Sequence, residues 1–258
     1  MANMRKASSM KDIGHLDMHY KRGVPKGHYS NPDINQERLD EDRQNFAPTR
    51  YQRDIKGNLI LDSDGRPIEQ KITDYIKSTI DKIMDGKTLR KDAVKMISWV
   101  VDAPKNMSEE IKPRFFQATY DFLAKRYGDK SGLGEDVVLS CYWHKSETTD
   151  HIHFAFMPII ERPDGTKSFC AKEVVGRSEL KSFHEDLEKH LVSLGICNKG
   201  DIKNGKTQRD SYGRALSVKE LKMRDKKRER DTQTHSEKKS RWDSNNLERT
   251  TDRKKGRW

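Results

Sequence analysis

The chain has 258 residues, of which 36% are charged and 32% are hydrophobic, and its formal net charge is +11. This composition allows one domain with a moderate core plus a polar tail, and it favours a partner that carries negative charge. No apolar run approaches the roughly 18 residues of a membrane helix and the N-terminus lacks the apolar segment of a signal peptide, so we expect a cytoplasmic protein without membrane insertion.

The first 66 residues show little hydrophobic periodicity and many turn formers, at 23–27, 30–33 and 62–67. We therefore expect this segment to form strands and loops that pack on a core formed by other parts of the chain. Isoleucines then recur at helical spacing over 68–83, which predicts an amphipathic helix closed by Gly86. Residues 94–101 follow as a strand.

A second helix is predicted from Ser108 or Pro113, with aromatic and leucine side chains on its buried side and Gly128 at its end. A hairpin over 137–160 follows, and then a turn at 163–165 and a short strand at 168–170. Ser178 can cap a last helix that stops at Gly195. This order predicts an α+β fold with an antiparallel sheet, helices packed on one face, and the other face open.

Three histidines and a glutamate fall within ten residues of the hairpin: His144, Glu147, His151 and His153. Because side chains alternate along a strand, His151 and His153 project to one face while Ile152 and its apolar neighbours project to the other. His144 ends the preceding strand and can lie across from this pair, so three imidazoles can converge on one divalent cation.

The alternative is a set of ordinary surface histidines on a half-exposed hairpin, which is the usual reading of any single histidine. The shared face and the concentration of three of nine histidines favour a metal site. Imidazole ligands suit Zn, Mn, Fe, Cu or Ni, so the residues alone leave the metal open.

The last 40 residues carry 15 Lys and Arg against eight Asp and Glu, a net +7 of the total +11. Few apolar residues follow Thr232, which is typical of a solvated, partly helical or disordered tail. We therefore divide the chain into a domain at 1–200 and a basic tail at 201–258. The tail is either a solvated end or a nonspecific phosphate-binding arm.

Taken together, these patterns resemble the MobV-type (Mob/Pre, plasmid mobilisation and recombination) relaxases over roughly residues 10–196. The family's metal motif H-x-D-E-x-x-P-H-x-H stands here at 144–153, with Ser146 and Asp150 as departures. Its H-x-x-R is present as His19 to Arg22, and S-N-x-D-I-N as 30–35. The family's N-Y-x-L corresponds to 43–46, where Gln44 replaces the tyrosine.

The resemblance implies an HUH-like nuclease with a ferredoxin-like palm, in which the histidines hold Mn²⁺ or Mg²⁺ against a phosphate. Such an enzyme nicks one strand at an origin of transfer, in single-stranded or supercoiled DNA, by metal-assisted transesterification. It stays joined to the 5′ phosphate and leaves a free 3′-OH for later rejoining, as plasmid mobilisation and DNA recombination require. Conjugation coupling proteins are further expected partners.

For the nucleophile the resemblance favours His19, with Glu147 accepting the other ring N–H and orienting the imidazole. Tyr20, Tyr29 and His28 remain alternatives, because the loop after Arg22 can shift the register. Arg22 is expected to hold a flanking phosphate as a bidentate clamp. The contrary reading makes His19 an ordinary polar loop residue.

Two other functions stay open. The altered second motif at Gln44 is compatible with a noncatalytic or degenerate relaxase-fold protein that binds DNA without nicking it. A metal-dependent hydrolase of a small substrate would use the same histidines but would have no use for the basic tail.

Overall fold

The computed structural model describes residues 2–24, 29, 31, 33–202, 220, 223–224, 227 and 230. Two compact units divide the chain, at Met1–Asn204 and Gly205–Trp258. The described residues of the second unit, from Glu220 to Arg230, are helical. Apart from them and the first two positions, the predicted tail at 201–258 lies outside the described residues. No helix in the described ranges is long and apolar enough to cross a membrane.

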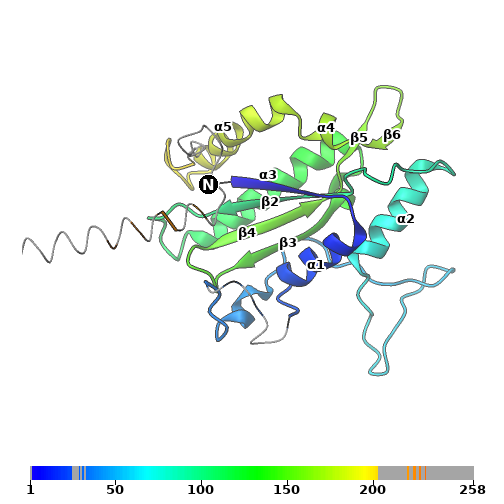
Figure 1. Ribbon diagram of the computed structural model, residues 1–258, viewed down its shortest axis with the longest axis horizontal. Helices are drawn as coiled ribbons and strands as arrows, with labels where there is room; N and C mark the ends of the chain where they lie inside the picture. The colour runs from blue at the N-terminus through cyan, green and yellow to red at the C-terminus, as the bar shows by residue number, and fades with distance from the viewer. Residues whose placement is uncertain are drawn as a thin grey trace, which may run out of the picture. The chain divides into compact units, whose positions relative to one another are not determined.

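A four-stranded antiparallel sheet forms the centre of the first unit (Figure 1). Its strands are β1 (Ala2–Ala7), β2 (Met96–Asp102), β3 (Val138–His144) and β4 (His151–Phe156), in the order β1-β2-β4-β3. A separate pair consists of β5 (Ile159–Glu161) and β6 (Lys167–Phe169). The antiparallel α+β architecture predicted from the sequence is confirmed.

One face of the sheet is covered by α3 (Lys112–Ser131) and α5 (Arg177–Ser193), with the short α4 (Ala171–Val174) beside them. Tyr127 of α3 stacks on Phe156 with ring centroids 4.0 Å apart, and Phe183 of α5 stacks on Trp99 at 3.9 Å. Buried aromatic pairs of this kind add to the stabilisation from area burial alone. The apolar sides of both predicted helices therefore face this core.

The predicted end of α3 at Gly128 is wrong, because the helix continues to Ser131 and Gly132 is the left-handed cap, with φ +61°. Gly128 is needed for a different reason. A Cβ atom at position 128 would lie 2.8 Å from the backbone oxygen of Gly134. The glycine lets the 3₁₀ turn η2 (Gly134–Val137) pack directly on the helix backbone.

The helix α2 (Ile72–Met84) begins four residues later than predicted. Residues 51–69 instead form isolated antiparallel bridges, among them Tyr51 with Glu69 and Leu61 with Pro67. Ile68 is used in this arm, where its N–H donates to the carbonyl oxygen of Ile60. The helix ends at Met84, and its C-cap Asp85 has a left-handed φ of +44° just before Gly86.

The helix α1 (Met10–Tyr20) lies within the segment that was expected to contain only strands and loops. Ser9 caps it by accepting a hydrogen bond from the Asp12 N–H. Its last residue, Tyr20, stacks on His153 at 4.5 Å, so α1 packs against the histidine face of the sheet. The expectation that this face is open and that all helices lie on the other face is corrected accordingly. The 3₁₀ turn η1 (Leu39–Arg43) lies beside β3 on the way to α2.

Candidate metal and nuclease site

The three hairpin histidines converge as the strand pattern predicts. His144 at the end of β3 is directly opposite His151 at the start of β4. The His144 and His153 ring centroids are 4.5 Å apart, and those of His151 and His153 are 4.8 Å apart. All three residues are buried, at 0% to 8% exposure. The side-chain alternation of β4 and the register of the hairpin together bring the rings to one point.

Backbone carbonyl groups fix the protonation of two of these rings. The His144 Nε2 lies 2.9 Å from the Tyr20 carbonyl oxygen, and the His151 Nδ1 lies 2.8 Å from the Thr149 carbonyl oxygen. Because a carbonyl only accepts, each of these nitrogens must carry the hydrogen. The lone pair of His144 Nδ1 therefore remains free, and the lone pair of His151 Nε2 accepts from His153 Nε2 at 3.1 Å. Outer hydrogen bonds of this kind orient histidine ligands in metal sites.

The remaining nitrogens complete a suitable donor set for a metal ion. His153 is hydrogen-bonded to His151 through Nε2, and its other nitrogen, Nδ1, is buried and has no partner among the described residues. His144 Nδ1 is buried and has no hydrogen-bond partner among the described residues. Burial lowers the pKa values of His144 and His153, which keeps both rings neutral and able to donate a lone pair. These residues fit a divalent cation such as Mn²⁺.

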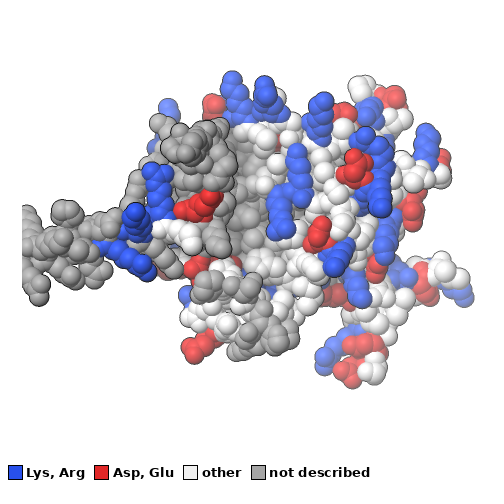
Figure 2. Space-filling model, viewed as in Figure 1, with Lys and Arg blue, Asp and Glu red and all other residues white. Residues whose placement is uncertain are grey.

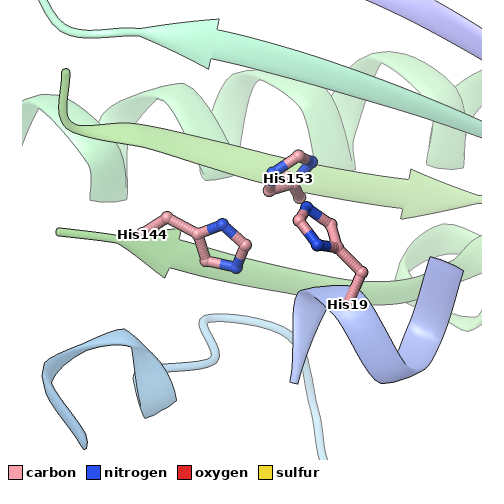
Figure 3. A group of neighbouring side chains, drawn as sticks. All are labelled: His19, His144 and His153. Carbon is pink, nitrogen blue, oxygen red and sulfur yellow. The ribbon is translucent and has the colours of Figure 1, made fainter. Parts of the chain in front are cut away.

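His19 joins this cluster from the last turn of α1. Its ring centroid is 5.5 Å from that of His144 and 5.3 Å from that of His153. Figure 3 shows the three rings pointing toward one another, with His19 coming from the helix and the others from the strands. The nitrogen atoms that His19, His144 and His153 can offer to a metal all lie within 4.8 Å of one another. The position expected for a reacting group is thus beside the candidate metal site.

The His19 imidazole is neutral at physiological pH. Burial is the main cause that lowers its pKa to about 4, and the neighbouring His144 ring adds to the effect. A neutral imidazole has a free lone pair, which both a metal ligand and a nucleophile require. The electrostatic environment is therefore compatible with either role.

Glu147 lies in the turn between β3 and β4, where it was expected, but its hydrogen bonds lead elsewhere. Its Oε1 accepts from Arg22 Nη2 at 2.8 Å and its Oε2 accepts from Asn31 Nδ2 at 3.2 Å. Oε1 is also 3.7 Å from His144 Nδ1. Burial alone would raise the pKa of Glu147, but the neighbouring His144 ring and the hydrogen bond from Arg22 outweigh it and lower the pKa below its ordinary value. The carboxylate is ionised and borders the metal position, and the expected bond to His19 stays a prediction.

Arg22 is buried rather than presented to a phosphate. Its backbone has a φ of +53°, and its side chain is only 1% exposed. Nε donates to Asp42 Oδ2 at 2.7 Å, and Nη2 donates to Glu147 Oε1. A bidentate clamp needs an accessible guanidinium, so the expected role of Arg22 as a phosphate clamp is corrected to one inside the protein, where it connects α1 with the metal turn.

Asp42 was not predicted as part of the site. It is fully buried and accepts from the Lys145 N–H at 2.6 Å, from the Ser146 N–H at 2.8 Å and from Arg22. Ser146 also donates its hydroxyl to this carboxylate. Burial would raise the pKa of Asp42, but the hydrogen bonds from Ser146 and Arg22 lower it. Nothing in the acidic run around Asp42 distinguishes it in the sequence.

The alternative nucleophiles occupy different positions. The Tyr20 hydroxyl lies 2.7 Å from Ser98 Oγ, and burial raises its pKa, so it stays protonated. Burial also raises the pKa of Tyr29, whose ring lies 5.8 Å from the Arg22 guanidinium carbon. His28 lies outside the described residues. The backbone oxygen of Gln44 accepts from the Trp143 N–H at 3.1 Å, so the position that lost the family's tyrosine borders β3.

Comparison with known proteins gives a consistent family. The family model described as plasmid recombination enzyme (Mob_Pre) matches residues 61–213, more than half of the chain. A plasmid recombination enzyme of Lactiplantibacillus plantarum is 25% identical over 159 residues, which are 58% of this chain and 40% of that protein. A type 1 enzyme of Staphylococcus aureus is 32% identical over 114 residues, or 42% of this chain and 26% of that protein. The chain thus spans less than half the length of these relatives.

The fold also matches solved structures. A Mn-bound crystal structure of the MobM relaxase domain (MOBV; Mob_Pre), bound to plasmid pMV158 oriT DNA, superposes with a TM-score of 0.61. The two chains are 22% identical, and the match covers 86% of this chain and 97% of that one. A second Mn-bound complex of the same domain gives a TM-score of 0.60 at 23% identity, with 86% and 98% covered. The α+β relaxase fold predicted from the sequence is confirmed.

Proposed function

The chain belongs to the Mob_Pre family of plasmid recombination enzymes, and on that premise we propose that it is a metal-dependent relaxase that nicks one DNA strand at an origin of transfer. One observation carries the proposal. Two overlapping groups of possible metal ligands share His144: His19 and His153 complete one group, and Glu147 and His151 complete the other. The Mn-bound oriT complexes of the MobM domain support the same assignment.

His144, His151 and His153 would hold a divalent ion, Mn²⁺ or Mg²⁺. When bound, the ion would supply positive charge to the scissile phosphate and stabilise the charge that develops on its oxygens. Glu147 is ionised beside this position and can offer an additional oxygen ligand. Manganese accepts both imidazole and carboxylate ligands, so the donor set suits it.

His19 is the proposed nucleophile. With its pKa at about 4, the ring keeps a lone pair at neutral pH and can attack phosphorus in line. A P–N bond then forms to the 5′ phosphate while the P–O3′ bond breaks. The attacking imidazole gives up the proton of its other ring nitrogen, and the departing oxygen takes up a proton to become the free 3′-OH. Attack by that hydroxyl on the phosphoramidate reverses the step and rejoins the strand.

The remaining partners follow from this substrate. A relaxase acts on supercoiled or single-stranded DNA and so would work in the cytoplasm, and conjugation coupling proteins would receive the nicked complex. The basic residues in 201–258 would add nonspecific phosphate contacts. Because the chain spans less than half the length of the relatives, these assignments are proposals about the activity of the whole protein.

The deciding experiment is a nicking assay on supercoiled DNA of the plasmid or mobile element that carries this gene. With Mn²⁺ we expect open circles that carry protein on the 5′ end at one mapped position, and none in excess EDTA. A protein that binds this DNA and never nicks it would instead be the noncatalytic relative that the change at Gln44 allows. Its metal affinity, measured separately, would then still report on the histidine site.

A further inference from the structure

A groove with a volume of about 580 Å³ lies at the end of the sheet away from the metal histidines. It is bordered by the end of β1, the loop before β2, β6, α4 and the first turn of α5. Four cationic side chains line it, with apolar residues between them: Lys6, Arg90, Lys172 and Arg177 around Phe169 and Leu180. This combination does not belong to the metal site.

The charges of this groove are largely unneutralised. The acidic lining residue, Asp92, lies 3.9 Å from Arg90, and both side chains are more than 80% exposed. In the described part of the chain, the other three cations form no ion pair. Figure 2 shows Lys and Arg side chains over β1 and around the α4 end of this face. Solvent-exposed cations held together without anions attract a polyanion.

The edge strand β1 connects the groove to the metal face. Arg5 pairs with Ser98 and Ser98 with Ala155, so the Arg5 side chain projects on the histidine face. The next residue, Lys6, projects on the opposite face, toward the groove. Both side chains are exposed. Cations therefore follow the chain around the unpaired edge of the sheet.

The separation of the two sites suits one continuous nucleic-acid strand. Asn3 of β1 lies opposite Val100 of β2, which in turn lies opposite His153 of β4. Lys6 is three residues further along β1. Strand geometry then puts the Cα atoms of Lys6 and His153 about 14 Å apart. A few nucleotides of extended backbone can span this distance.

We propose that Arg5, Lys6 and the groove bind the phosphate backbone of single-stranded DNA that continues from the metal site around the β1 edge. The inference rests on the proposed relaxase function for its substrate, and it assigns to exposed residues the phosphate contacts that the buried Arg22 does not make. The competing explanation is that charges on β1 only keep the open sheet edge from pairing with another chain.

The test compares two triple variants of the full chain that lose equal charge. The groove variant is Lys6→Gln, Lys172→Gln and Arg177→Gln. Its matched control, Lys82→Gln, Lys125→Gln and Lys189→Gln, removes exposed cations from α2, α3 and α5 outside the groove. Binding of a fluorescein-labelled single strand of mixed sequence, about 30 nucleotides long, is measured in EDTA at several salt concentrations.

The slope of log K against log salt should fall by about 2 in the groove variant, because each lost phosphate contact on a single strand contributes about 0.7. The control should keep its slope. An unchanged slope in the groove variant would overturn the proposal, as would a loss confined to a duplex probe of the same length. Dimers of the groove variant with unchanged binding would support edge protection instead.

Because this binding is measured in EDTA, it does not depend on nicking. The protein could fail to nick its own plasmid while the groove variant still shows a smaller salt dependence of DNA binding. That result would refute the relaxase proposal and still support DNA binding by the groove. Melting curves of both variants are measured to check that the fold is retained.

Discussion

At the scale of single residues, the metal site depends on the nitrogen of each ring that faces away from it. His144 and His151 each donate a hydrogen bond to a backbone carbonyl group, which leaves the other nitrogen deprotonated and aimed inward. The sequence pattern predicted which histidines share a face. It could not predict the carbonyl partner of His144, because the Tyr20 carbonyl group comes from a helix more than a hundred residues earlier.

Replacing His151 or His153 with alanine should weaken Mn²⁺ binding by about 100-fold or more, since a ligand contributes at least as much as the outer partners of ligands do. Isothermal titration calorimetry measures the affinity, and circular dichroism checks the fold. His15→Ala, an exposed histidine on α1, is the control. Equal affinities in the three proteins would refute the site.

The covalent adduct should be a phosphoramidate if His19 is the nucleophile. Protonation of the nitrogen labilises a P–N bond, so we expect an adduct that resists alkali, is lost in mild acid and is absent in His19→Ala. Tyr20→Phe and Tyr29→Phe should still form it. Gel analysis of end-labelled DNA after acid or alkali distinguishes the bond. An acid-stable adduct that disappears in Tyr29→Phe would move the nucleophile into the loop.

At the scale of elements, local patterns predicted the hairpin, α3 and α5, because their apolar spacing is regular and each buries one side. The same reasoning missed α1, whose sequence interrupts its apolar positions with Gly14, His15 and Asp17. Ser9 and Asp12 were the available signal for its start. Arg22 was predicted to be an exposed phosphate ligand because the sequence gives the residue type and not its burial. The burial of Arg22 depends on its contact with Asp42 in a separate turn.

Asp42→Ala should lower the free energy of unfolding by about 3 to 5 kcal/mol, because it leaves the buried Arg22 guanidinium without one partner. Glu41→Ala, which removes an exposed ion pair with Arg38, should change it little. Urea unfolding measures both.

The hydrogen bonds at Asp42 lower its pKa, so its contribution is present above its unfolded pKa near 3.8 and is lost as pH falls through the folded value. The difference between the wild type and Asp42→Ala should therefore narrow in acid. An equal loss for Asp42→Ala and Glu41→Ala at neutral pH would contradict the buried network.

Two glycines in helices should respond oppositely to alanine. Gly128→Ala should destabilise the protein by about 1 to 3 kcal/mol, because the new Cβ would lie 2.8 Å from the Gly134 oxygen. At Gly14 in α1 no heavy atom lies within 4 Å of the new Cβ, so Gly14→Ala should add up to about 1 kcal/mol. Thermal melts of both variants measure the change in stability. A stabilised Gly128→Ala variant would show that η2 can move away from the α3 backbone.

At the scale of the whole molecule, most of the net positive charge lies in residues 219–258, C-terminal to the domain that holds the histidines. The sequence composition alone already indicated this. Truncation after Leu216 removes the 15 Lys and Arg residues of 219–258, so it should weaken binding to mixed-sequence DNA and flatten its dependence on salt. Fluorescence anisotropy at several salt concentrations measures the slope. The same slope and affinity in the truncated chain would show that the tail takes no part in binding.

The position of α1 has a consequence for how the protein is made. His19 is synthesised early, but His144 and His153, which complete its site, follow more than 120 residues later. Strand β1 likewise precedes its partner positions on β2 by 89 to 99 residues. Closing such distant contacts is slow relative to local folding. An incomplete nascent chain therefore carries the proposed nucleophile without the groups that would direct it at a phosphate, and the proposed nuclease site is complete only after β4 has been synthesised.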